Sequence, residues 1–149
     1  MVGYTVEKNE TKKSKDLKMG MANEIVVQPM IEEYFEMKVQ NTKETIGKYC
    51  AYDYESIDLS TRYELKSRRV HSKAYDEVFI STRKIKKGYK YGCRLVLLFL
   101  FNDGLYTIDY NREVFSKFRI DNVSFPRDDR YEEDEVIFIP NTLLTKINV

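Results

Sequence analysis

Histidine, cysteine pairs and glycine-rich motifs are scarce in this sequence. Its single histidine, His71, and the lack of a G-x-S-x-G segment argue against a serine hydrolase. No P-loop or G-x-G-x-x-G segment occurs, so a nucleotide cofactor is unsupported. Cys50 and Cys93 lack the C-x-x-C spacing of a structural zinc site. We therefore expect free thiols in a reducing compartment and a surface position for His71.

Long hydrophobic runs are also missing. No apolar stretch approaches the roughly 18–20 residues that a membrane-spanning helix needs, and residues 1–20 lack the apolar region of a signal peptide. We expect an intracellular protein, in the cytoplasm or nucleus of a host cell, with no membrane partner. The 149 residues suit one domain. Residues 1–20, polar and lysine-rich, are expected to form a flexible arm before a single domain at 21–149.

The net charge of +1 hides an uneven distribution of charge. Between Arg62 and Arg94 there are 11 lysines and arginines, opposed by three acidic residues, whereas residues 128–135 are strongly acidic. A local concentration of positive charge of this kind favours a polyanionic partner such as nucleic acid. The simpler alternative is that these lysines and arginines form a solvated face.

Two short segments with alternating polarity lie on either side of residues 57–60. In an extended strand, residues two apart point to the same face, so Glu64 and Lys66 share a face. If the segments pair around a turn at 57–60, Asp53 can lie close to Glu64. Two carboxylates and a lysine would then converge. Oxygen clusters of this kind suit Mg²⁺, and the lysine could direct a water at a phosphate.

This pattern resembles the PD-(D/E)XK phosphodiesterase superfamily, the restriction-endonuclease-like nucleases. Its acidic residue corresponds to Asp53, and its E-x-K tripeptide to 64–66, 11 positions later. Ala51-Tyr52 stands where the family often has proline. E-x-K also occurs at 10–12 and 36–38, so the tripeptide alone is not informative. The tripeptide at 64–66 differs from these two because it lies in a strand pattern and follows Asp53.

The flanking segments extend the resemblance over residues 22–145, in particular to members encoded by large DNA viruses and phages. The run 22–35 resembles the family's N-terminal helix, with Glu24 at the position of a further carboxylate. The segment 75–88 resembles an extended stretch followed by a short basic helix, and 94–110 a β-hairpin. The implied fold is α/β, a restriction-endonuclease-like mixed β-sheet flanked by helices with an αβββαβ-type core.

The function implied by the resemblance is a metal-dependent endonuclease that hydrolyses DNA phosphodiester bonds with a metal-activated water. Asp53, Glu64 and the carbonyl of Leu65 would bind Mg²⁺ or Mn²⁺, Lys66 would orient the water, and Glu24 would act through a metal-bound water or a second metal. Cleavage of two strands would suit a homodimer, and a monomer would suit nicking. The residues expected to hold the DNA backbone are Arg68, Arg69, Arg83, Lys84 and Lys87.

Other interpretations remain open at this point. The scaffold could be a catalytically inactive nucleic-acid-binding module, or the chain a small interaction protein without a nucleic-acid role. Asp53, Glu64 and Lys66 could form an exposed charge cluster on a hairpin. The 12 tyrosines could stack on bases, although packing within strands explains them better.

A helix is expected to begin at Asn23 as its N-cap and to end by Asn41 and Gly47. Pro29 should kink it or begin a new turn. Its apolar stripe, read at helical spacing, comprises Val26, Met30, Tyr34 and Met37.

Strands are expected in the second half of the chain. The segment 93–101 is the strongest apolar run and predicts a buried central strand. Asn102-Asp103-Gly104 predicts a hairpin turn leading into 105–110, with Asp109 at the strand end. A last strand at 135–140 should precede a short helix that Asn141 caps and that runs through Leu143, Leu144 and Ile147.

Overall fold

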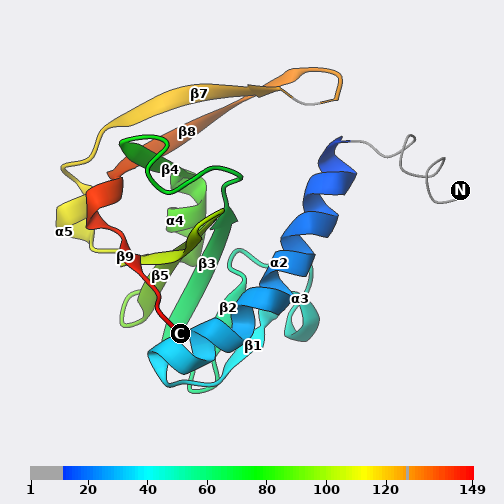
Figure 1. The fold of residues 1–149 in the computed structure, drawn as a ribbon, viewed down its shortest axis with the longest axis vertical. Helices are drawn as coiled ribbons and strands as arrows, with labels where there is room; N and C mark the ends of the chain where they lie inside the picture. Colours follow the sequence, from blue (N-terminus) through cyan, green and yellow to red (C-terminus); the bar gives the residue numbers. More distant parts are fainter. Residues whose placement is uncertain (1–11, 127) are drawn as a thin grey trace, which may run out of the picture.

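The computed structural model describes residues 12–126 and 128–149 and contains two β-sheets, one long helix and several short ones (Figure 1). The larger sheet has the order β1 (Val39–Asn41), β2 (Tyr54–Ser56), β3 (Thr61–Ser67), β5 (Arg94–Phe101), β6 (Gly104–Asp109) and β9 (Thr145–Lys146). The smaller sheet has the order β4 (Glu77–Ser81), β8 (Tyr131–Pro140) and β7 (Ile120–Pro126). The helices are α2 (Lys12–Phe35), α3 (Thr42–Thr45), α4 (Thr82–Gly88) and α5 (Arg112–Phe115).

The larger sheet is mixed. Strand β3 pairs with β5 in parallel, and the other neighbours pair antiparallel. The parallel pair requires a crossover, which the chain makes through β4 and α4. The predicted mixed sheet flanked by helices is therefore confirmed at the level of an α/β fold.

Strand β5 is buried on both of its faces, which explains its continuous apolar sequence. Val96 and Leu98 belong to a core beneath α2, whereas Leu97 and Phe99 belong to a second core with α4 and the smaller sheet. The prediction of a buried central strand is confirmed. The hairpin at 102–104 is confirmed as well, and Gly104 supplies the turn with a positive φ of 144°.

Helix α2 packs on the sheet through a different face from the predicted one. Val27 and Ile31 are fully buried, whereas Val26 is 66% exposed. The predicted stripe was one position out of register, because residues 25–27 are all apolar and both stripes fit a helical period. Contact with the sheet, rather than local pattern, selects the buried stripe.

The ends of α2 also differ from the prediction. The helix begins at Lys12, so Asn23 is no N-cap, and residues 12–20 of the predicted arm are helical. Residues 1–11 of the predicted arm lie outside the described residues. The helix includes Pro29 and ends at Phe35, followed by Glu36 at a φ of 52°, the left-handed conformation common just after a helix.

The C-terminal segment corrects a further prediction. Residues Asn141–Leu143 form a single 3₁₀ turn, and the chain continues into β9 instead of a helix. The amide of Asn141 donates to the carbonyls of Ser72 and Tyr75, so it fastens the 71–75 loop rather than capping a helix. The predicted strand 135–140 is the inner part of β8, which begins earlier and pairs with the unpredicted β7.

Within the described ranges, no helix has the length and apolar character needed to cross a membrane.

Candidate active site

Strand β3 carries the E-x-K tripeptide at the centre of the larger sheet. Its parallel register with β5 places Glu64 beside Leu97 and Lys66 beside Phe99, and both of these β5 residues face the core that contains α4. Tyr63 and Leu65 belong to the opposite core beneath α2. The predicted shared face of Glu64 and Lys66 is therefore confirmed.

Asp53 directly precedes β2 and lies along the edge of β3. The predicted turn at 57–60 is confirmed, since β2 and β3 are antiparallel neighbours on either side of it. The N–H of Asp53 donates to the Tyr63 carbonyl at 2.9 Å, and the N–H of Leu65 donates to Oδ2 of Asp53 at 2.7 Å. The Asp53 carboxylate thus accepts the Leu65 N–H, a backbone donor of β3 that lies beyond the end of the pairing with β2. The N–H and C=O of one strand residue point to the same edge, so the Leu65 carbonyl is directed toward this side as well.

Lys43 joins Asp53 to Glu24. Its ammonium donates to Oδ1 of Asp53 and lies 2.9 Å from Oε1 of Glu24. Asn41, the N-cap of α3, donates to the other oxygen of Glu24 at 3.3 Å. Glu24 of α2 and Asp53 are thereby held in one cluster, as the sequence predicted. Lys43 was missed, because an isolated lysine in a short polar segment carries no motif.

Glu64 is the most deeply placed carboxylate on the β3 face, with 3% of the residue exposed. Its Oε1 lies 3.1 Å from the ammonium of Lys66 and 3.6 Å from that of Lys84 on α4. Its Oε2 is buried and has no hydrogen-bond partner within the part of the chain that the structure describes. An unsatisfied buried oxygen costs free energy, and such atoms in native proteins often mark an ion or a catalytic role.

The three carboxylates have divergent acidities. Burial, followed by the hydrogen bond with Asp53, raises the pKa of Glu24 to about 7. Burial also opposes ionisation of Asp53, but the Lys43 ammonium outweighs it and lowers the pKa of Asp53. Burial raises the pKa of Glu64, and the charge of Asp53 adds to that effect. In the sheet, Asp53 lies beside the strand position that follows Glu64, since its carboxylate accepts the N–H of Leu65.

The donor chemistry of this cluster fits a hard divalent cation in the two-carboxylate arrangement. No group of three or more His, Cys, Asp or Glu side chains is placed to hold a metal ion in residues 23–126 and 128–149, where side chains are described. Mg²⁺ needs only one or two carboxylates and keeps several waters. Asp53 and Glu64 offer such a pair, with the unpartnered Oε2 of Glu64 as the free oxygen. Lys43 engages both Glu24 and Asp53, and Asp53 alone of these two also accepts a backbone N–H of β3.

The basic residues predicted to contact DNA divide into two groups. Arg83 and Lys87 are exposed on α4, Lys84 is half-exposed there, and Arg69 is exposed after β3. Together with Lys66, the three residues of α4 line a hollow beside Glu64, here called the basic hollow (Tyr49, Cys50, Ala51, Lys66, Ser81, Arg83, Lys84, Lys87 and Asp134).

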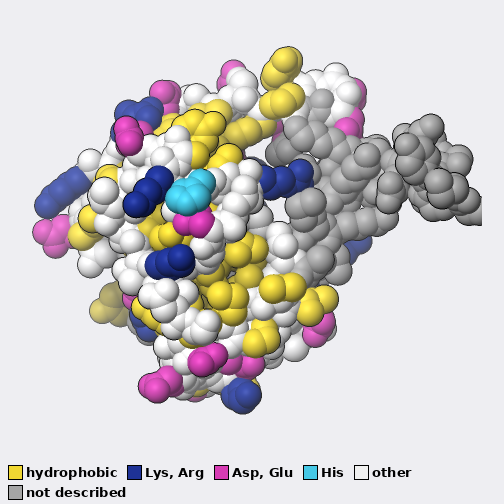
Figure 2. Space-filling model, in the orientation of Figure 1, with side chains coloured by type: hydrophobic (Ala, Val, Ile, Leu, Met, Phe, Trp, Pro, Cys, Tyr) yellow, Lys and Arg dark blue, Asp and Glu magenta, His cyan; other side chains and the backbone are white. Residues whose placement is uncertain are grey.

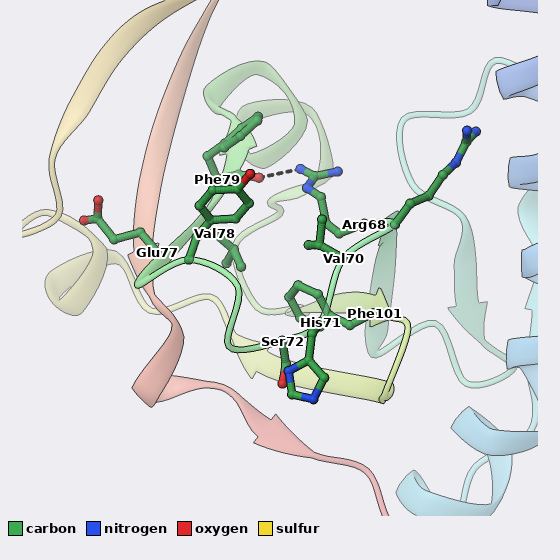
Figure 3. Close-up of a pocket in the computed structure, with 10 residues that line it drawn as sticks. Arg68, Val70, His71, Ser72, Glu77, Val78, Phe79 and Phe101 are labelled. Carbon is green, nitrogen blue, oxygen red and sulfur yellow. Dashed lines mark hydrogen bonds between the residues drawn. The ribbon is translucent and has the colours of Figure 1, made fainter.

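Arg68 has a different environment from the predicted one. Its guanidinium donates to the Phe79 carbonyl at 2.6 Å and lies over the Phe79 ring, 4.9 Å from its centroid. Figure 3 shows the two side chains directed toward each other, next to a small apolar hollow formed with Val70 and Phe101. Arg68 therefore supports the loop and strand around it, whereas Arg83 and Lys87 of α4 are exposed, with Arg83 3.5 Å from Asp134.

His71 and the other polar residues considered above lie away from the carboxylates. The His71 side chain is 58% exposed, as predicted, and points away from Arg68 and Phe79 (Figure 3). Asp103 accepts hydrogen bonds from the N–H and hydroxyl of Ser72, so it stabilises a turn, and Asp109 pairs with Arg94 at the strand end. Cys50 is half-buried at the rim of the basic hollow.

Comparisons of this chain with protein-family models, with curated proteins and with solved structures found no match.

Proposed function

We propose that this protein is a Mg²⁺-dependent endonuclease that hydrolyses DNA phosphodiester bonds, on a restriction-endonuclease-like scaffold of the PD-(D/E)XK type. The observation that carries the proposal is the buried oxygen of Glu64, which has no hydrogen-bond partner in the described part of the chain. Glu64 pairs with Lys66, and the N–H of the intervening residue, Leu65, donates to Asp53. Buried polar atoms in native proteins are rarely left without a partner, and a bound ion or a catalytic role is among the explanations for those that are.

Each residue of the cluster has a role in this reaction. Asp53, Glu64 and the Leu65 carbonyl would hold Mg²⁺ or Mn²⁺, which supplies Lewis acidity and a more acidic bound water. Lys66, with 26% of its side chain exposed, reaches from Glu64 into the basic hollow. From there its ammonium orients the attacking water and offsets the charge that develops on the phosphate. Lys84 assists Lys66 in positioning Glu64.

The remaining residues position the substrate and the first carboxylate. Arg83 and Lys87 hold phosphates of the strand without reading its sequence. Glu24, Lys43 and the N–H of Leu65 together fix the orientation of Asp53. One copy of the chain supplies one such site, so cleavage of both strands of a duplex would require a homodimer.

A second candidate is a catalytically inactive nucleic-acid-binding module, and one observation favours it. The Lys43 ammonium already neutralises Asp53 and Glu24, so these carboxylates are stabilised without a divalent cation. In that case the basic hollow would bind phosphates, and no bond would be broken.

The decisive experiment is cleavage of supercoiled plasmid in the presence of Mg²⁺ or Mn²⁺. We expect nicked or linear product from the wild type and from Lys117→Ala, a control that removes an exposed lysine elsewhere. Lys66→Ala and addition of EDTA should each abolish cleavage. Wild-type protein that leaves plasmid, single-stranded and branched DNA intact would contradict the nuclease and favour the binding module.

A further inference from the structure

Three phenylalanines cluster on the smaller sheet and are half-buried. Phe79 of β4 lies 5.8 Å from Phe125 of β7 and 5.9 Å from Phe138 of β8, measured between ring centroids. Arginines flank them on both sides: Arg68 lies over Phe79, and the guanidinium of Arg119 lies 3.7 Å from the centroid of Phe138. Val78 and Ile80, the neighbours of Phe79 along β4, supply the core instead. The phenylalanines therefore belong to the face turned away from that core.

This aromatic face forms one wall of a cleft that reaches the candidate active site. The cleft, here called the aromatic cleft, is lined by Lys66, Arg68, Phe79, Ser81, Arg83, Phe125, residues 132–134 and Val136. It shares Lys66, Ser81, Arg83 and Asp134 with the basic hollow. In Figure 1, β3 ends between α2 and the β7–β8 hairpin, and Figure 2 shows hydrophobic side chains exposed over the hairpin.

The two neighbouring spaces differ in charge. The basic hollow presents Lys66, Arg83, Lys84 and Lys87, with Asp134 as its acidic residue. In the aromatic cleft, the carboxylates of Glu132, Glu133 and Asp134 on the hairpin wall balance the cations Lys66, Arg68 and Arg83. Phosphates are therefore attracted to the first space more strongly than to the second. An aromatic surface beside a phosphate-binding surface is the arrangement by which proteins bind single strands, because each base can stack while the backbone follows the positive charge.

We propose that the aromatic cleft receives an unpaired nucleobase of the strand whose phosphate occupies the basic hollow, so that the substrate is single-stranded or locally unpaired DNA. This inference rests on the proposed nuclease function for the identity of the strand. Phe125 and Phe79 provide the stacking surface. Bases within an intact duplex are stacked on one another and cannot enter the cleft.

The acidic wall also selects among the bases. An ionised carboxylate only accepts hydrogen bonds, and it pairs well with exocyclic amino groups such as N4 of cytosine and N6 of adenine. Thymine has no exocyclic amino group, and the carbonyl oxygens on either side of its N3–H face the carboxylates unfavourably. Cytosine and adenine strands should therefore bind more tightly than thymine strands of the same length.

The test is binding of fluorescent oligonucleotides, measured by anisotropy without divalent cations, so that it does not depend on cleavage. The probes are single strands of cytosine, thymine and abasic residues, together with a duplex, all matched in their number of phosphates. We expect the affinity order cytosine, thymine, abasic, with the abasic strand bound roughly 5- to 150-fold more weakly than cytosine, the range for loss of stacking on one base. Equal affinity for the cytosine and abasic strands, or no binding to any probe, would overturn the proposal.

Variants assign the effect to the cleft. Phe125→Leu keeps the apolar volume but removes the aromatic face, and it should bring cytosine binding down toward the abasic level. Phe118→Leu, which alters a half-buried phenylalanine packed against the other core, is the matched control. If Phe125→Leu binds like the wild type while circular dichroism shows both variants folded, the cleft is not the base site. If the wild type still cleaves plasmid with Mg²⁺ in that case, the proposed nuclease function is supported and only the role of the aromatic cleft is refuted.

Discussion

At the scale of single residues, Lys43 holds the carboxylates of Glu24 and Asp53 together. No sequence motif identifies this lysine. It lies between Glu24 and Asp53, with 16% of its side chain exposed. Removing one member of a buried ion pair leaves uncompensated charge, which costs up to roughly 3–5 kcal/mol. We expect Lys43→Met to lower the midpoint of thermal unfolding strongly, and Lys38→Met, at an exposed lysine, to leave it nearly unchanged.

The metal response of Lys43→Met tests the site further. If Asp53 and Glu64 bind a divalent cation, Mg²⁺ should restore part of the lost stability, because a ligand that binds the folded state shifts the unfolding equilibrium. A variant that is destabilised but insensitive to Mg²⁺ and Mn²⁺ would argue for a purely structural cluster.

Glu24 gives the protein a stability that depends on pH. Its pKa in the folded state is about 7, above the ordinary 4.5, so folding favours the protonated carboxyl. That contribution is present below about pH 4.5 and is lost as the pH rises through about 7. The unfolding midpoint of the wild type should fall between about pH 5 and pH 8, and Glu24→Gln should show a smaller fall. Parallel pH profiles for the two proteins would refute this assignment.

At the scale of elements, the sequence predicted the structure correctly where the pattern of apolar residues fits a single arrangement. Strand β5 has apolar residues at nearly every position, and the β3 alternation places Glu64 opposite Tyr63 in any strand. Helix α2 offered two equivalent stripes, and only the sheet decides between them. The C-terminal residues after Pro140 were predicted as a helix because pairing with β6, a contact distant in sequence, was not predictable from local residues.

The orientation of α2 yields a matched pair of substitutions. Ile31 is fully buried, whereas Ile25, on the same helix, is 67% exposed. Ile31→Ala should destabilise the fold by roughly 2–5 kcal/mol, the cost of a cavity in a packed core. Ile25→Ala should change stability by less than about 0.5 kcal/mol, because a surface site has little packing to lose. Chemical denaturation of the two variants measures both values, and similar losses would mean that α2 presents another face to the sheet.

At the scale of the whole molecule, the net charge is close to zero, but basic and acidic residues lie on different surfaces. The run of basic residues near the middle of the chain folds into α4 and the end of β3, and the acidic run folds into the β7–β8 hairpin. Sequence reasoning found both runs. It could not predict that they face each other across one cleft, because this requires the pairing of β8 with β4.

The number of basic residues in the basic hollow limits how strongly salt can weaken the proposed binding of DNA. The basic hollow offers Lys66, Arg83, Lys84 and Lys87 to phosphates. Each phosphate contact with a single strand contributes about 0.7 to the slope of log affinity against log salt, so four contacts predict a slope of about −3. Lys87→Ala should make the slope shallower by about 0.7, whereas Lys117→Ala should leave it unchanged. Titrations of single-stranded DNA at several salt concentrations measure the slope. A value near zero would show that the hollow does not bind phosphates, and a much steeper one that binding extends to basic residues beyond it.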